Sequence, residues 1–302
     1  MKAIRDNDTI QIEVTNFCPN MCANCTRLCP HVAKPFFMDF EYFKKAVDSL
    51  EGTGCMVGVM GGEPLFHPQF KEISTYLKSK FPFKQCGLWT CFPKGKEHYA
   101  ELIAETYGNI FLNDHTRDDI LHAPILVSAE EVIPDIADMW YTIDHCWMQR
   151  CWSASINPHG AFFCEIAASM SMLIGKPGDG WNIDIERNWW KKSSIHYQAQ
   201  MSQWCRMCGG AMPLKKRFSV ENKDDISPAW LELLKDSSPR IKRGEYEIHN
   251  LQRQQDSRQM ATYKDEFYRK RIADRYGLFI VLDEKGFFEP HVKKIERRLK
   301  GA

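Results

Sequence analysis

The sequence predicts an α/β protein built around a partial, open β/α barrel with parallel strands. Strand-like apolar runs alternate with amphipathic helical stretches over roughly the first 130 residues, which is typical of a parallel sheet with helical crossovers. Residues 55–60 form a short continuous apolar run, as expected of a strand covered on both faces. Only about five strand–helix units fit before residue 130, so the barrel is expected to stay open on one side.

The elements of this barrel follow from the spacing of apolar residues. Apolar and polar residues alternate over 10–15, which predicts a first strand. From Asp39 the apolar residues recur at helical intervals until the glycines at 52 and 54. The remaining barrel elements are the strand at 55–60, a helix that opens at His67-Pro68, a strand at 85–90, a helix that ends at Gly108, and strands at 109–112 and 124–127.

The second half of the chain has a different composition. We predict a helix at 130–141, a β-hairpin of 152–156 with 161–164, and a helix at 189–204. Residues 211–250 are polar and show no sustained period, whereas a helix at 251–275, a strand at 278–282 and a basic helix at 291–299 are expected after them. The predicted domains are a barrel at 1–140, a hairpin-plus-helix module at 141–212, and a C-terminal α+β extension of unassigned role at 213–302.

Composition limits the class of function. The 302 residues carry a formal net charge of +1, which offers neither a basic field for a nucleic-acid backbone nor a polybasic membrane patch. The N-terminus lacks the apolar core of a signal peptide, and no apolar run approaches the ~20 residues of a membrane span. Twelve cysteines in such a chain indicate metal ligation rather than a disulfide framework. We therefore expect a cytoplasmic protein with no membrane or nucleic-acid partner.

The most informative motif follows the first strand. Cys18, Cys22 and Cys25 stand at C-x3-C-x2-C spacing and can ligate three irons of a cubane cluster. The fourth iron is then left without a protein ligand, so a small molecule can chelate it. Cys29 or His31 is the alternative fourth ligand; otherwise they are a loop cysteine and a surface histidine. A structural zinc site at the same cysteines is the other alternative.

A second motif ends the next strand, at Gly61-Gly-Glu-Pro64. With these two motifs at consecutive strand ends, residues 10 to about 130 resemble the radical S-adenosylmethionine superfamily. The resemblance implies a 4Fe–4S cluster on Cys18, Cys22 and Cys25, with S-adenosylmethionine on the open iron and its methionyl amino group against Gly61, Gly62, Glu63 and Pro64. It also implies a flavodoxin- or ferredoxin-type reductant and a 5′-deoxyadenosyl radical that abstracts a hydrogen atom from substrate.

The later cysteines resemble the twitch module, a shortened relative of the SPASM module, which holds an auxiliary 4Fe–4S cluster. Cys164 lies on the second hairpin strand, and Cys205 and Cys208 follow a helix, as in that module. The first ligand is Cys146 or Cys151; we favour Cys146 because the family's first ligand stands well upstream of the hairpin. Only three residues separate Gly160 from Cys164, where the family has four, and a tetrahedral zinc site is the alternative use of these cysteines.

The cysteine that is not a ligand, Cys151 in the favoured assignment, could return a hydrogen atom to a substrate radical as a catalytic residue; alternatively it is a buried cysteine that packs as a small hydrophobe. The resemblance implies an oxidoreductase or epimerase acting on a small polar substrate such as a sugar, aminosugar or nucleotide sugar. A peptide-modifying maturase of the SPASM/twitch type is the alternative, disfavoured because the barrel starts by about residue 10 and a second auxiliary cluster lacks ligands. A non-catalytic iron–sulfur electron carrier is the second alternative.

Overall fold

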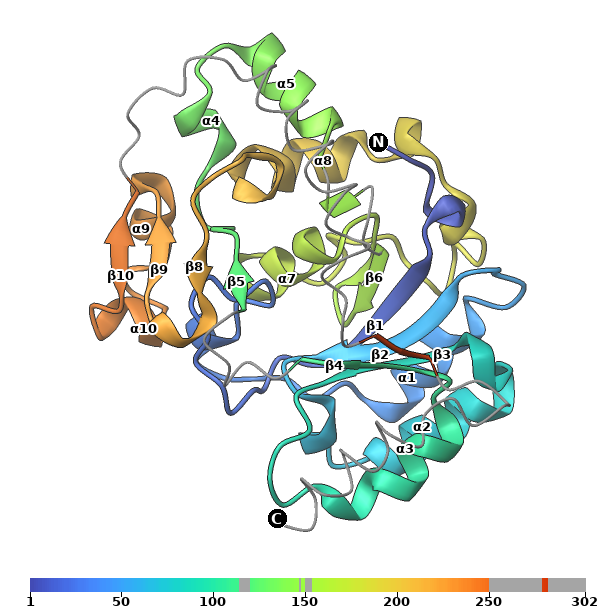
Figure 1. Ribbon diagram of the computed structural model, residues 1–302. Helices are drawn as coiled ribbons and strands as arrows, with labels where there is room; N and C mark the ends of the chain where they lie inside the picture. Colours follow the sequence, from blue (N-terminus) through green and yellow to red (C-terminus); the bar gives the residue numbers. More distant parts are fainter. Residues whose placement is uncertain (114–119, 147, 150–153, 250–278, 282–302) are drawn as a thin grey trace.

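The computed structural model in Figure 1 describes residues 1–302 except for 114–119, 147, 150–153, 250–278 and 282–302. Its centre is a seven-stranded sheet with the strand order β11-β4-β3-β2-β1-β6-β7. The strands are β1 (Thr9–Thr15), β2 (Met56–Gly61), β3 (Cys86–Thr90), β4 (Asn109–Leu112), β6 (Ala154–Asn157), β7 (Gly160–Phe162) and β11 (Phe279–Val281). Strands β1, β2, β3, β4 and β6 are parallel, and β7 and β11 are antiparallel to their neighbours. The predicted α/β class with a mostly parallel, open sheet is confirmed.

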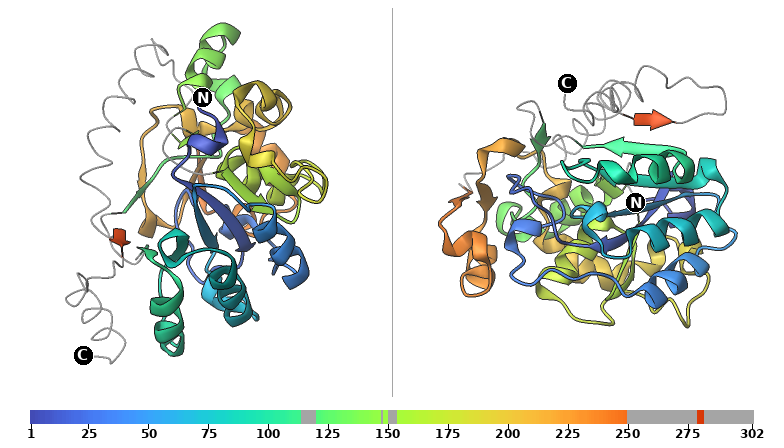
Figure 2. Two further views of the ribbon diagram at one scale, coloured as in Figure 1. Left: turned by 90° about the vertical axis from the view of Figure 1, so that its right-hand side faces the viewer. Right: turned by 90° about the horizontal axis from the view of Figure 1, so that it is seen from below.

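Three amphipathic helices cover one face of this sheet. They are α1 (Phe40–Asp48), α2 (Phe70–Lys80) and α3 (Ala100–Thr106), and they lie together below the sheet in Figure 1 and in the left view of Figure 2. The side chain of Asp39 caps α1 by accepting a hydrogen bond from the N–H of Tyr42 at 3.1 Å. Alternate strand residues such as Ile12 and Val59 pack against these helices in the main core.

The opposite face of the sheet carries different residues. Trp89 on β3 stacks on Phe111 of β4 with a ring-centroid distance of 4.0 Å. A Cβ atom at Gly58 would stand 2.0 Å from the indole of Trp89, so glycine is needed for the indole to lie against β2. Glu13 and Gln11 of β1 are buried on this inner face, because they alternate with the outward-facing Ile10 and Ile12.

The second half of the chain extends the same sheet. The predicted hairpin is present as β6 and β7, and β6 pairs with β1, so the sheet crosses the predicted boundary at residue 140 and the division into domains stays a prediction. Helix α7 (Glu165–Ile174), which the sequence analysis does not predict, contacts both hairpin strands. Together with α8 (Gln198–Trp204) it lies on the side of the sheet away from α1, α2 and α3 (Figure 1).

Residues 213–249 form small elements where the sequence shows no regular period. Strand β8 (Arg217–Phe218) pairs with β5 (Leu121–His122), and β9 (Asp224–Ile226) pairs in parallel with β10 (Tyr246–Ile248). Helices α9 (Pro228–Leu234) and α10 (Pro239–Lys242) each begin with proline at the first position. In Figures 1 and 2 these elements lie beside the loop that follows β1.

The predicted strand at 124–127 is wrong. These residues are buried, but their backbone bonds go to loops: the carbonyl of Ile125 accepts from Gly209 N–H and that of Leu126 from Ser227 N–H, both at 2.9 Å. The strand position beside β4 is filled by β11, which confirms the strand predicted at 278–282. The buried apolar run at 124–127 does not form a strand, because its carbonyls bond to loops and β11 already pairs with β4.

Two predicted helices are interrupted. The helix expected at 130–141 is divided at Pro134 into α4 (Ala129–Val132) and α5 (Ile136–Asp144). The helix expected at 189–204 consists of two single turns followed by α8, because the carbonyl of Lys192 accepts hydrogen bonds from Ile4 N–H and the Tyr197 hydroxyl instead of a helical partner. The helices expected at 251–275 and 291–299 lie outside the described residues. Among the helices that are described, none is long and apolar enough to cross a membrane.

Candidate active site

The Gly-Gly-Glu-Pro turn is packed directly on the backbone that leads into the first cysteine loop. Gly62 N–H donates to the Thr15 carbonyl and Glu63 N–H to the Phe17 carbonyl, each at 2.7 Å. A Cβ atom at Gly61 would lie 2.0 Å from the Thr15 carbonyl oxygen, and one at Gly62 would lie 2.2 Å from that of Phe17. Both glycines are thus required for this close backbone approach, which brings the two predicted motifs together at one edge of the sheet.

The carboxylate of Glu63 joins the ends of two neighbouring strands. It accepts hydrogen bonds from the N–H of Leu65 (3.1 Å), the Thr90 hydroxyl (2.7 Å) and the N–H of Cys91 (2.7 Å), and the side chain is 1% exposed. Burial raises its pKa, although the donors at Thr90 and Cys91 oppose that rise. Most of its roughly four acceptor positions are therefore used to fix the turn. Its predicted contact with a methionyl amino group stays a prediction.

The three cysteines of the loop are close neighbours. Burial raises the pKa of Cys18 to about 12, and the nearby Cys25 adds to the rise. Burial also raises the pKa of Cys22, to which both Cys25 and Cys18 contribute. The neighbouring Cys29 lowers the pKa of Cys25 to about 7, and the Cys29 thiol itself donates a hydrogen bond to the Arg27 carbonyl at 3.8 Å. Three neighbouring sulfurs in one partly buried loop form a donor set that suits an iron–sulfur group, and Cys29 stands next to it.

His31 is not a surface residue, and that expectation was wrong. Its side chain is buried, with Nε2 2.6 Å from Oδ2 of Asp224 and Nδ1 2.8 Å from the Ser238 hydroxyl. Both ring nitrogens therefore have partners outside the cysteine loop, which removes the physical basis for considering His31 as a ligand. No local pattern around His31 indicates this, because Asp224 lies 193 positions further along the chain.

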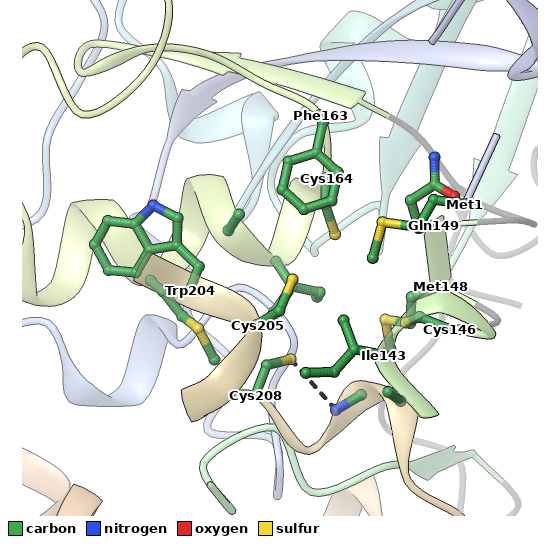
Figure 3. A pocket seen from close by; sticks show the side chains of 15 residues that line it. Met1, Ile143, Cys146, Met148, Gln149, Phe163, Cys164, Trp204, Cys205 and Cys208 are labelled. Atoms are coloured by element: carbon green, nitrogen blue, oxygen red, sulfur yellow. Dashed lines mark hydrogen bonds between the residues drawn. The ribbon is translucent and has the colours of Figure 1, made fainter. Parts of the chain in front are cut away.

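The second cysteine group comes together from separate elements around one pocket. Cys146 follows α5, Cys164 is the residue before α7, and Cys205 and Cys208 follow α8. Figure 3 shows all four side chains at the wall of this pocket. The predicted alternative, Cys151, lies outside the described residues.

The lining of this pocket is largely apolar, with Phe163 and Trp204 among the wall residues. Burial raises the pKa of both Cys164 and Cys205, and the neighbouring cysteines raise them further. The raised pKa values keep these thiols protonated, and four thiolates in such a place would be stable only with a cationic metal group to balance their charge. Within the described part of the chain, no three His, Cys, Asp or Glu side chains converge on a single-ion site. Instead the four sulfurs surround a space, which suits a group of several metal atoms.

A buried ion pair connects the two cysteine groups. Arg27, two residues after Cys25, lies 2.6 Å from the carboxylate of Glu165, the residue after Cys164. The Arg27 guanidinium also donates to the Glu165 carbonyl and the Ser169 hydroxyl, and both partners of the pair are less than a tenth exposed. Burial opposes the charge on Arg27, but Glu165, Glu13, Cys25 and Cys164 together raise its pKa. Its positive charge therefore stands between the two sets of sulfurs.

Sequence reasoning missed two residues of the first site. Arg27 had a local signal, its position inside the cysteine loop, but its partner could be found only from the fold. Cys91 lies just after β3 and is partly exposed. Its pKa is raised by burial and by the Glu63 carboxylate, with Cys18 also nearby. The signal for Cys91 was that it directly follows a parallel strand, at the edge that carries both motifs.

Comparison with known proteins leaves the chain without a family assignment. No model of a protein family matches it, and no curated protein does either. Among solved structures, BtrN in complex with AdoMet and 2-DOIA is similar at 14% identity over 68% of this chain and 88% of that chain, with a TM-score of 0.44. Selenomethionine BtrN in an open conformation is similar at 14% identity over 68% and 87%, with a TM-score of 0.41. TM-scores below 0.5 do not establish a shared fold, and the proposed function rests on the residues of this chain.

Proposed function

We propose that this chain is a radical S-adenosylmethionine enzyme that abstracts a hydrogen atom from a small polar substrate. The observation that carries the proposal is the packing of the Gly61–Pro64 turn on Thr15–Phe17, directly before the three neighbouring cysteines. Two motifs 36 or more positions apart in the sequence thereby form one site at the carboxyl edge of a parallel sheet, where α/β enzymes bind their reactants.

In this proposal Cys18, Cys22 and Cys25 hold a 4Fe–4S cluster and leave one iron open. When bound, this group supplies the electron that splits S-adenosylmethionine and so makes the hydrogen-abstracting fragment. The protein's own contribution is geometric: the glycines keep the turn against the loop, and Glu63 fixes that turn to the end of β3. Only the middle of the loop, residues 22–24, is buried, which leaves the sulfurs of Cys18 and Cys25 in partly exposed positions.

The four cysteines of the second pocket would hold an auxiliary cluster with no open position. Because every iron of such a cluster has a protein ligand, it suits electron transfer rather than substrate binding. Arg27 and Glu165 set the position of this pocket relative to the first loop. An oxidation of substrate by two electrons would use both sites, and an auxiliary group beside the first is consistent with that outcome.

Polar groups on the inner face of the sheet support a small polar substrate. Gln11 pairs in register with Ser155 of β6, and Glu13 follows on the same face. The side-chain oxygens of these residues are buried and have no hydrogen-bond partner among the described residues. Buried oxygens usually have partners, so a ligand rich in hydroxyl or amino donors, such as a sugar or aminosugar, would satisfy them. Oxidation or epimerisation of such a compound is the reaction we propose.

Anaerobic reconstitution tests the proposal. The reconstituted protein, reduced with dithionite in the presence of S-adenosylmethionine, should release 5′-deoxyadenosine, measured by liquid chromatography and mass spectrometry. It should contain close to eight irons per chain, from about four per cluster. A variant with Cys18, Cys22 and Cys25 replaced by Ala is the control and should release none. A wild-type protein that carries both clusters and releases no 5′-deoxyadenosine would instead be an electron carrier.

A further inference from the structure

Residues 217–245, which we call the loop dock, hold the first cysteine loop along its length. Arg240 is fully buried, and its Nη1 donates to the carbonyls of Cys22 at 3.0 Å and Met21 at 3.3 Å. The next loop residue, Ala23, donates its N–H to the Ser219 carbonyl at 2.8 Å. The loop therefore receives backbone support from a segment some 200 positions away, within the extension whose role the sequence left open.

Asp224 is the centre of this contact. One carboxylate oxygen accepts a hydrogen bond from the N–H of Asn24. The other lies 2.6 Å from Nε2 of His31 and 3.3 Å from Nε of Arg240. Asn24, inside the cysteine loop, and His31, six residues after Cys25, are thus joined to the dock through one buried carboxylate, and His31 also reaches Ser238 at 2.8 Å.

Asn24 and Asp225 form a second, more peripheral connection between the cysteine loop and the dock. The amide of Asn24 donates to Oδ2 of Asp225 at 2.9 Å, and Asp225 N–H donates back to Oδ1 of Asn24 at 2.8 Å. Asn24 has a φ of 48°, a left-handed conformation that asparagine tolerates better than most residues. All four consecutive residues from Met21 to Asn24 thus bond to the dock.

The charge of Arg240 adds a further observation. The Nη1 atom of Arg240 lies 3.0 Å from the Cys22 carbonyl oxygen, so the guanidinium stands beside that cysteine. The Nη2 atom of Arg240 is buried and has no hydrogen-bond partner among the described residues. A buried N–H donor beside a cysteine of the loop is suited to an anionic acceptor such as a thiolate or an inorganic sulfide.

We propose that the loop dock is a positioning element for the first cluster, with Arg240 as its central residue. Arg240 holds the loop carbonyls in place and provides positive charge and a hydrogen-bond donor to the anionic iron–sulfur group. The inference rests on the proposed function, because it assumes that the loop carries that group. It assigns the described part of the C-terminal extension to the cluster site rather than to recognition of a partner.

The test compares Arg240→Met with Arg243→Met in the full-length protein after anaerobic reconstitution. Arg243 forms an ion pair with Glu245 at the surface, so its loss should leave the iron content near eight per chain. Arg240→Met should retain about four irons and lose the electron paramagnetic resonance signal that responds to S-adenosylmethionine. The second cluster, whose four proposed cysteine ligands lie outside the loop dock, then serves as the internal standard for a folded protein. Arg240→Lys, which keeps the charge and one donor, should recover part of the responsive signal.

If Arg240→Met also loses the second cluster because it does not fold, a milder variant tests whether the dock positions the first cluster. Asn24→Gly removes both side-chain bonds to Asp225 while glycine accepts the left-handed backbone. It should bind both clusters but release the iron of the first to a chelator several-fold faster than wild type, and the iron of the second at the wild-type rate. The inference would be overturned if Asn24→Gly released iron from both sites at the same rate. It would also be overturned if Arg240→Met and Arg243→Met had the same iron content and the same electron paramagnetic resonance signals. A wild-type protein without any signal that responds to S-adenosylmethionine would instead reject the proposed function.

Discussion

The two cysteine groups of this protein are built in opposite ways. The first uses three cysteines within eight residues of one loop, and distant residues of the dock hold that loop from outside. The second takes its four cysteines from the ends of three helices, α5, α7 and α8, and its pocket is formed by the fold itself. The first group also has the thiol of Cys29 beside it, whereas the second has apolar walls such as Phe163 and Trp204.

This difference indicates different demands on the two sites. A site that must leave one iron open cannot be closed by converging helices, so a short loop with external support is a suitable solution. A site with four ligands can be rigid and enclosed, because nothing has to enter it during the reaction. The predictions below test whether the two groups really differ in this way, from the largest expected effect to the smallest.

Replacing Cys22 by Ala should abolish the release of 5′-deoxyadenosine, and replacing Cys164 by Ala should not. Without Cys22 the first cluster loses one of three ligands, whereas loss of Cys164 affects only the enclosed site. Each variant should retain about four irons per chain, but at different sites. Product analysis by mass spectrometry and iron analysis provide the measurement. Release of 5′-deoxyadenosine by Cys22→Ala would contradict the proposed division of roles.

Cys146→Ala and Cys151→Ala separate the ligand from its neighbour in sequence. Cys146 lines the pocket with the other three cysteines, so its loss should remove the second cluster and about four irons. Cys151→Ala should keep close to eight irons, and if Cys151 donates a hydrogen atom, it should stop turnover of substrate without stopping cleavage of S-adenosylmethionine. If Cys151→Ala lost about four irons and Cys146→Ala kept close to eight, Cys151 would be the ligand of the second cluster and Cys146 would not.

The contrast between the sites also explains what the sequence could and could not show. The spacing of Cys18, Cys22 and Cys25 is local, as are the strand and helix periods of the first barrel units, so these were predictable. Cys205 and Cys208 were equally visible as a pair. The partners of the loop were not, because Arg240 and Asp224 have no local pattern that connects them to Cys22. Helix α7 was missed because its residues are buried on nearly all sides and show little amphipathic period.

Removing one member of the ion pair between the sites should destabilise the protein strongly. Arg27→Met leaves Glu165 buried without its partner, at a cost of about 3–5 kcal/mol, or on the order of 6–10 °C in Tm. The control is Lys80→Met, since Lys80 and Asp48 form a pair that is roughly half exposed, and such surface pairs contribute little to stability. Anaerobic thermal unfolding followed by circular dichroism measures both. Equal Tm values in the two variants would show that the pair does not hold the sites together.

Stability should depend on pH through Glu13 on the inner face. Burial raises its pKa from 4.5 to about 7, with Arg27 and Asn157 opposing the rise and Glu165 and Cys25 adding to it. The folded protein then binds the proton more tightly than the unfolded chain, so stability falls as pH rises from about 4.5 to about 7. Between pH 5.5 and 8 the loss should be roughly 2 kcal/mol, at 1.36 kcal/mol per pKa unit.

Glu13→Gln, which cannot ionise, is the matched control for that pH dependence. The difference in Tm between wild type and Glu13→Gln should grow from pH 5.5 to about pH 7 and then stay constant. Anaerobic thermal scans at several pH values measure it. Parallel curves for the two proteins would mean that Glu13 keeps an ordinary pKa, for which a bound donor on the inner face would be the physical explanation.

The smallest expected effect tests whether one iron of the first cluster is left without a protein ligand. Cys29 lies four residues after Cys25 and lowers the pKa of that thiol, so it is near enough to the first group to be considered as a fourth ligand. If it were one, both sites would be closed and the contrast between them would disappear. We expect Cys29→Ser to keep close to eight irons and to release 5′-deoxyadenosine within about twofold of wild type, because serine retains a hydrogen-bond donor toward the Arg27 carbonyl. Loss of the first cluster in Cys29→Ser, or a wild-type cluster signal that does not change when S-adenosylmethionine is added, would show that the polypeptide closes this site as it closes the other.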